Sequence, residues 1–245
     1  MSKAPQRGKL RNPPKGRRYA YIAIVAVLVV LAGSGLYVYG SRIQAASSST
    51  STATTFANTA CTPSTSTSSG GANGTYALIC TNLGLIEVQL FPANAPQTVA
   101  NFVKLANSGF YNDLVWHRIV PGFVIQAGDP NTKNGGGNRS TWGQGTSGTN
   151  LPFENSSLSE AVGTIAMAST GSKVGGSSQF FINLVDNTAS LDGNYVVFGQ
   201  VINGMSVVNA LAKVPTNTTQ SAPNYQQPVN PSQAYIVSVT IQNTP

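Results

Sequence analysis

The segment WHRIVPGFVIQAGD, residues 116–129, holds two short apolar runs on either side of a turn pair, Pro121-Gly122. The runs Val115–Ile119 and Phe123–Ala127 are rich in branched and aromatic residues, which favour strands. Proline followed by glycine is typical of a tight turn. The segment therefore predicts two short strands joined by a turn. The polar stretch after it, Asp129–Asn150, predicts a long loop of the functional or partner-ordered kind.

Further strands are predicted on both sides of this segment, at Thr75–Ile79, Leu83–Phe91, Thr164–Ala168, Gln179–Asn183, Val196–Val201 and Ile236–Ile241. A helix is predicted from Pro96 to just before Gly109, with Asn94 as its cap, because apolar residues recur there at helical spacing. A second, shorter helix is predicted over Gly204–Lys213. Many short strands without β-α-β alternation predict a mainly β fold, either a closed antiparallel barrel or a sandwich.

Charge is concentrated at the start of the chain. The net charge is +7, and residues 1–18 alone hold seven basic and no acidic residues. After Arg42 the chain has six basic and seven acidic residues, so the predicted domain is nearly neutral. A nucleic-acid-binding face would need clustered basic residues on the domain. The composition therefore argues against a nucleic-acid partner.

The basic tail, residues 1–18, precedes an apolar stretch, 19–40, that contains no charged residue. A stretch of this length can cross a bilayer as a helix. The excess of positive charge before it predicts a cytoplasmic N-terminus, with the rest of the chain outside the cell membrane. Residues 41–74 are rich in Ser and Thr and predict a flexible linker. The predicted domain occupies 75–245.

Two alternatives for residues 19–40 are a cleaved signal peptide and a buried core helix. The apolar run exceeds the roughly 7–15 residues of a signal core, and Ile43-Gln44-Ala45 is a poor cleavage site. A core helix would show one polar and one apolar face, and this stretch is apolar all round. An uncleaved membrane anchor is therefore the favoured interpretation, ahead of a signal peptide.

Cys61 and Cys80 are the two cysteines of the chain. Both fall on the extracytoplasmic side in the predicted topology, where oxidising conditions permit a disulfide. Two free thiols are the alternative, with Cys80 as a small buried strand residue. We favour the disulfide. Neither cysteine has neighbours at the spacing of metal ligands, so a zinc site is not expected.

Four blocks, in order along the chain, carry a resemblance to a known family. Residues 116–129 resemble the signature of the cyclophilin family of peptidyl-prolyl isomerases. Pro96–Phe102 resembles its first helix, and Gly163–Ala168 with Ser178–Ile182 its central strands. Leu191–Gly199 resembles its closing hairpin. The tail and linker agree with a bacterial, membrane-anchored form of the family.

The resemblance covers roughly Tyr76–Ile241 and implies a closed eight-stranded antiparallel β-barrel capped by two α-helices. It implies catalysis of rotation about X–Pro bonds without a cofactor, metal or covalent intermediate, in a protein expected to be a monomer. The partners it implies are proline-containing polypeptides. Carried over by position, the catalytic residue is Arg118. The substrate-binding residues are Phe123, Val124, Gln126, Ala168, Ser169, Phe181, Leu191 and Tyr195.

The proposed residues also suit the chemistry. Rotation must break amide resonance, a barrier of roughly 18–20 kcal/mol. No proton has to leave the substrate, so a fixed cation such as Arg118 that donates to the prolyl nitrogen is of more use than a base. Taken singly, Phe123 and Phe181 could be core aromatics and Arg118 a surface charge. His117, the one histidine, is expected to be structural.

Two departures from well-studied members lie near the pocket. The segment Asn187–Ser190 lacks the tryptophan often found there, and Tyr195 stands where a histidine is frequent. Since Arg118 and the apolar pocket remain, activity is expected to persist. The predicted function is isomerisation that assists folding of exported proteins. The alternatives are a non-catalytic proline-peptide-binding chaperone or an envelope adaptor.

Overall fold

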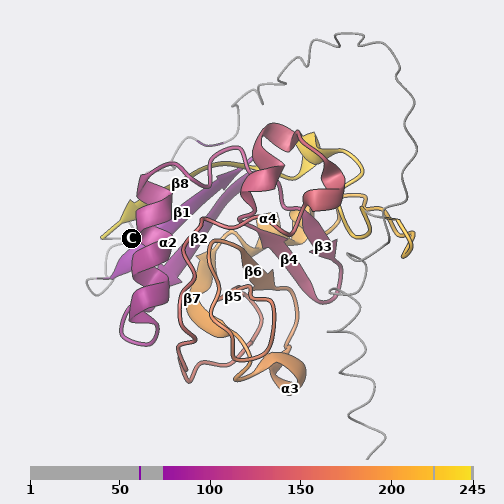
Figure 1. The fold of residues 1–245 in the computed structure, drawn as a ribbon. Coiled ribbons are helices and arrows are strands. Elements are labelled where there is room, and N and C mark those ends of the chain that lie inside the picture. The colour runs from indigo at the N-terminus through magenta and orange to yellow at the C-terminus, as the bar shows by residue number, and fades with distance from the viewer. Residues whose placement is uncertain (1–60, 62–73, 223, 244–245) are drawn as a thin grey trace, which may run out of the picture. The chain divides into compact units, whose positions relative to one another are not determined.

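The domain is built on one antiparallel sheet whose strands follow the order β3-β4-β6-β5-β7-β2-β1-β8 (Figure 1). The structure is a computed structural model that describes residues 61, 74–222 and 224–243. The strands are β1 (Thr75–Thr81), β2 (Gly84–Leu90), β3 (Arg118–Val120), β4 (Val124–Ala127), β5 (Thr164–Met167), β6 (Phe180–Asn183), β7 (Val196–Asn203) and β8 (Ile236–Gln242). The mainly β, eight-stranded antiparallel prediction is confirmed.

The sheet curls into a half-barrel, and its two edge strands are β3 and β8. An isolated bridge between Val115 and Tyr235, just ahead of each edge strand, links the two ends. The Trp116 N–H also donates to the Ala234 carbonyl at 2.9 Å. The expected closed barrel is therefore a curled sheet whose ends are joined by these contacts next to the strands.

Two helices cover the sheet, as expected: α2 (Pro96–Asn107) and α4 (Met205–Leu211). The buried side of α2 carries Val99, Phe102 and Leu105, which join the main core. That core takes one side of each strand, such as Ile86, Val88 and Leu90 of β2. Figure 1 shows α2 packed along the sheet near β1, β2 and β8.

Two local predictions differ from the structure, and one short helix was not predicted. Asn94 does not cap α2; the N-cap residue is Ala95, and Glu154 supplies the acceptors instead. Of the predicted strand Val115–Ile119, only the last two residues lie in β3, because the N–H groups of Val115 and Trp116 donate instead to Thr132 and Ala234 outside the strands. The one-turn helix α3 (Thr188–Leu191) was not predicted.

The loop predicted at Asp129–Asn150 contains two short 3₁₀ segments, η3 (Pro130–Gly135) and η4 (Arg139–Thr141). A third, η5 (Pro231–Gln233), precedes β8. The buried Asp129 carboxylate ties the loop together by accepting from the N–H groups of Asn131 and Gly143.

At the start of the domain, a disulfide joins Cys61 to Cys80 of β1, with the two Cα atoms 5.9 Å apart. Within the described ranges, no helix has both the length and the apolar character needed to cross a bilayer. The predicted membrane span at 19–40, the tail before it and most of the linker lie outside those ranges.

Candidate active site

A second apolar cluster lies on the face of the sheet opposite the main core. Neighbouring strand residues point to opposite faces, so each strand serves both clusters. In β6, Phe180 and Ile182 join the main core while Phe181 joins the second cluster. The buried members of the second cluster are Val124, Ala166, Phe181 and Val197. The cluster therefore has the outer face of the sheet as its floor.

Strand register aligns the site across five strands. Arg118 of β3 is paired with Gln126 of β4, and Gln126 is paired in turn with Phe181 of β6. Phe181 is paired with Ala166 of β5, and Ala166 with Val197 of β7. A cation, an amide and an apolar surface thus lie in one row on one face.

Partly buried side chains form the rim of this cluster: Phe123, Leu158, Ala168, Leu191 and Tyr195. The Tyr195 ring meets the Phe181 ring edge-on, with centroids 5.4 Å apart and planes at 89°. Leu191 is the last residue of α3. This concentration of apolar groups around Phe181 has the chemistry needed to bind a pyrrolidine ring.

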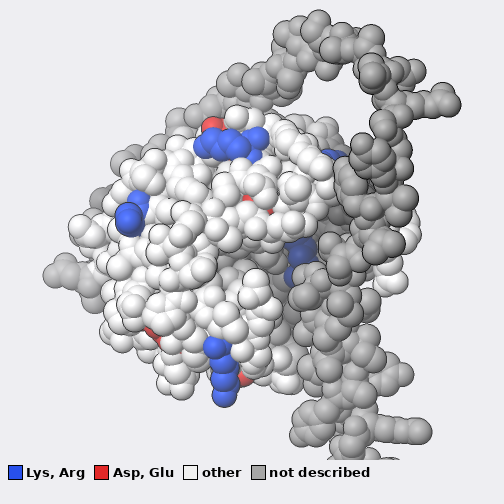
Figure 2. Space-filling view, in the orientation of Figure 1, with Lys and Arg blue, Asp and Glu red and all other residues white. Residues whose placement is uncertain are grey.

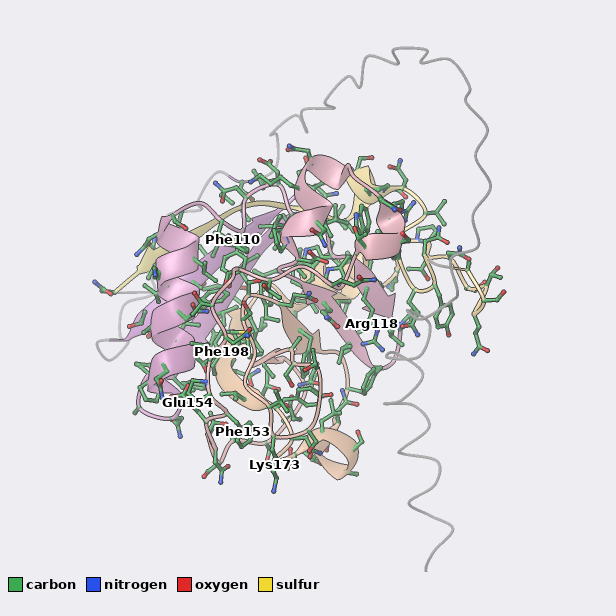
Figure 3. All side chains as sticks on the ribbon, viewed as in Figure 1. Phe110, Arg118, Phe153, Glu154, Lys173 and Phe198 are labelled. Carbon is green, nitrogen blue, oxygen red and sulfur yellow. A yellow bond between two sulfur atoms is a disulfide. The ribbon has the colours of Figure 1, made fainter. Side chains whose placement is uncertain are left out.

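Arg118 is the first residue of β3 (Figure 3). It is partly buried and lies next to Phe123 of this cluster. Its Nε donates to Gln226 Oε1 at 2.9 Å, and its Cζ lies 5.9 Å from the centre of the Phe123 ring. Burial lowers the pKa of Arg118, while Tyr195 and Tyr225 act in the opposite direction. An arginine remains charged in proteins, so the site holds a partly desolvated cation.

Gln126 is fixed by a second glutamine. Its Nε2 donates to Gln179 Oε1 at 2.9 Å, and Gln179 Nε2 donates to the carbonyls of Gly143 and Gly145. This chain of hydrogen bonds couples the long loop to the site row. Gln126 is therefore held in place beside Arg118.

The predicted pair Ala168 and Ser169 follows β5 directly. The Ala168 N–H already donates to the Gln179 carbonyl at 2.9 Å, and the Ser169 hydroxyl donates to the Gly171 carbonyl at 2.7 Å. Ala168 lies on the rim of the cluster. The structure thus brings Ala168 to the site, with its N–H engaged in the fold.

His117 is 3% exposed. Burial lowers the pKa of His117 to about 4, so the ring is neutral at ordinary pH. Its position fits the structural role that we expected.

Sequence reasoning missed three neighbours of the site: Leu158, Gln179 and Gln226. Gln179 was predicted as the first residue of a strand, Gln179–Asn183, but not as a residue of the site. Gln226 lies 108 positions after its partner Arg118 in a polar segment without periodicity. No local pattern in the sequence indicates that contact.

The family model described as "Cyclophilin type peptidyl-prolyl cis-trans isomerase/CLD" matches residues 76–239. The chain is 41% identical over 149 residues to peptidyl-prolyl cis-trans isomerase A of Dickeya dadantii, covering 58% of this chain and 73% of that protein. It is 38% identical over 173 residues to a peptidyl-prolyl cis-trans isomerase of Acinetobacter baylyi, covering 66% and 83%.

Among solved structures, a cyclophilin type peptidyl-prolyl cis-trans isomerase of Cryptosporidium parvum superposes with a TM-score of 0.59 and 28% identity, over 70% of this chain and 99% of that one. A second structure of it, determined in the presence of the dipeptide Ala-Pro, gives a TM-score of 0.57 and 27% identity, over 68% and 98%. The sequence match, the fold and the site agree: the chain belongs to the cyclophilin-type peptidyl-prolyl cis-trans isomerase family and is an enzyme that interconverts the cis and trans forms of peptidyl-prolyl bonds.

Proposed function

We propose that Arg118 is the catalytic residue and that the outer-face cluster is the pocket for the substrate proline. The observation that carries this proposal is the position of one partly buried guanidinium at the edge of a separate apolar cluster. Phe123, Val124 and Phe181 would bind the ring. Crystals of the Cryptosporidium relative were studied with Ala-Pro, which is consistent with a proline ligand.

The reaction needs stabilisation of a twisted amide. Loss of resonance leaves a lone pair on the prolyl nitrogen, and a guanidinium N–H of Arg118 can donate to it. In the planar isomers this lone pair is delocalised into the carbonyl group, so the interaction strengthens in the transition state, which is the condition for raising kcat. The partial burial of Arg118 strengthens the interaction further, because preorganised charges act most strongly away from water.

The remaining site residues would orient the substrate. Leu191 and Tyr195 form the far side of the pocket, next to Phe181. Gln126, with its amide held by Gln179, and the Ala168-Ser169 main chain would bind the peptide backbone. These residues all belong to one chain, so we propose that the enzyme acts as a monomer.

The role of Arg118 is tested on the full chain with an Xaa-Pro peptide. We expect Arg118→Ala to lower kcat/KM by about 10²–10³-fold, because it removes the donor to the developing lone pair. Lys104→Ala, which removes an exposed cation from α2, is the matched control and should retain full activity.

Equal activity in the Arg118→Ala variant and the unmodified chain would contradict the catalytic assignment. Peptide binding with background turnover in the unmodified chain would instead support a proline-binding chaperone or adaptor.

We also propose that residues 19–40 anchor the enzyme in a bacterial cell membrane, with the domain outside and exported proteins as its substrates. The support is the basic tail before an uncharged apolar stretch and the Cys61–Cys80 disulfide, since disulfides persist in oxidising compartments. Protease added to intact spheroplasts should release the domain by cutting within residues 41–74. A domain that stays protected until lysis would overturn the proposed topology.

A further inference from the structure

A loop that follows α4 folds back on itself beside β3, the strand that carries Arg118. We call the described residues 215–222 and 224–229 the strap. Thr216 and Pro228 form an isolated bridge, the Gln226 N–H donates to the Asn217 carbonyl at 2.8 Å, and the Asn217 N–H donates to the Gln227 carbonyl at 2.9 Å. Gln226 adopts a left-handed backbone conformation with φ of 63°. The strap thus has a defined backbone at Gln226.

The strap is bonded to β3 at two adjacent positions. The Ile119 N–H donates to the Gln226 carbonyl at 2.9 Å. The Arg118 Nε donates to Gln226 Oε1, also at 2.9 Å. One residue of the strap therefore holds the backbone beside the catalytic residue and its guanidinium at the same time.

The residues that follow Gln226 in the strap are bonded to Arg139 of η4. Arg139 Nε donates to Gln227 Oε1 at 3.2 Å, and Gln227 Nε2 donates back to the Arg139 carbonyl at 2.9 Å. Other N–H groups of Arg139 donate to the carbonyls of Pro228 and Val229. Since Gln227 is only 5% exposed, these bonds limit the movement of Gln226.

We infer that Gln226 is a positioning residue for the isomerase reaction, which orients the guanidinium of Arg118 by accepting from its Nε. An arginine has five N–H donors in a rigid fork. Binding the fork through Nε leaves the four terminal N–H groups for the substrate, and the Phe123 ring restricts the same group on another side. This inference rests on the proposed catalytic role of Arg118.

The side chain and the backbone of Gln226 have separable roles. The strap is held by main-chain bonds and by Gln227, whereas the side-chain amide of Gln226 bonds Arg118. Removing the amide should therefore leave the strap folded and release the guanidinium. A released guanidinium can still contact a bound peptide but is less often aligned with the twisted bond. The isomerisation rate of the bound peptide should therefore fall more than the peptide affinity.

The test measures the isomerisation rate of an enzyme-bound Xaa-Pro peptide and its dissociation constant by exchange NMR on the full chain. Gln226→Met keeps the length of the side chain without the amide. Gln226→Asn suits the left-handed backbone, but its amide is one methylene too short to reach Nε. We expect both to slow bound turnover about tenfold, with peptide affinity within about twofold of the unmodified chain.

Two further variants are matched to these. Gln226→Glu keeps an acceptor at the same reach, so it should recover turnover to within about threefold. Gln220→Met makes the same exchange at an exposed position of the strap and should have no effect. A merely structural role for Gln226 would not give rescue by Glu together with unchanged peptide affinity.

Turnover at the unmodified rate in both Gln226→Met and Gln226→Asn would overturn the inference. Equal losses of turnover and affinity would also overturn it, because they would indicate a binding role. Arg118→Ala is measured alongside. If it is fully active, the proposed function itself fails, whereas an inactive Arg118→Ala beside fully active Gln226 variants rejects the positioning role alone.

Discussion

At the scale of single residues, Glu160 is a buried carboxyl group bonded to the last residue of β6. It has no exposed surface, and its Oε2 accepts from Asn183 Nδ2 at 2.6 Å. Asn183 is bonded in turn to Asn187, whose side chain donates to the Phe123 carbonyl at 3.1 Å. Burial, with a contribution from Asp192, raises the pKa of Glu160 to about 7, and the bond from Asn183 opposes that rise.

The raised pKa of Glu160 predicts that the stability of the domain depends on pH. A carboxyl group whose pKa rises from 4.5 to about 7 on folding binds more protons in the folded state between those values. The free energy of unfolding should therefore fall as pH rises through this window, by up to roughly 3 kcal/mol. Glu160→Gln should remove this component, as measured by urea unfolding at pH 5 and pH 8. Parallel pH profiles for both proteins would show that Glu160 titrates normally.

At the scale of elements, α2 begins without a cap from its own segment. Its N-cap residue, Ala95, has no side-chain hydrogen bond. Instead the Glu154 carboxylate accepts from the N–H groups of Gln97 at 2.9 Å and Thr98 at 2.7 Å, and from the Thr98 hydroxyl at 2.6 Å. Figure 3 shows Glu154 beside the end of α2. A negative charge there also complements the helix dipole.

Removal of this remote cap should destabilise the domain. Glu154→Ala leaves two N–H groups of the first turn without their acceptor and removes a favourable charge, so we expect a loss of about 1–2 kcal/mol in the free energy of unfolding. Urea denaturation measures it, with Glu87→Ala on β2 as the control for loss of an acid. An unchanged midpoint for Glu154→Ala would show that water replaces the carboxylate at no cost.

The same helix shows what sequence can predict and what it cannot. The limits of α2 and of β2 were predictable, because Val99 and Phe102 recur at helical spacing and Ile86, Val88 and Leu90 alternate. The cap was not, because Glu154 lies 56 residues away from Thr98. The contact between Arg118 and Gln226 could not be predicted from the sequence for the same reason. A local sequence pattern indicates which residues of one helix or strand are buried. Contacts between residues far apart in the sequence depend on how the whole chain folds.

At the scale of the whole molecule, charges are sparse over the domain. Figure 2 shows isolated basic and acidic groups separated by wide uncharged areas. Among the described residues, one ion pair is found, Lys133 with Asp113 at 4.0 Å, and both side chains are exposed. An exposed ion pair of this kind contributes little to the free energy of unfolding. Stability therefore depends on the core and on the covalent link at the start of the domain.

That link, Cys61–Cys80, closes a loop with a sequence separation of 19. Constraining the unfolded chain over a loop of this size is worth about 3 kcal/mol. The double variant Cys61→Ser with Cys80→Ala should lose roughly that much unfolding free energy. Its isomerase activity should be unchanged, because β1 contributes no residue to the row from Arg118 to Val197.

Urea unfolding with and without dithiothreitol checks this prediction. Reductant should lower the stability of the unmodified chain to that of the double variant and leave the double variant unaffected. Loss of activity in parallel with stability would mean that the link also shapes the outer-face cluster. If thiol labelling of the native, unreduced chain found two reactive cysteines, the disulfide would be absent, and the argument for an oxidising compartment would lose its support.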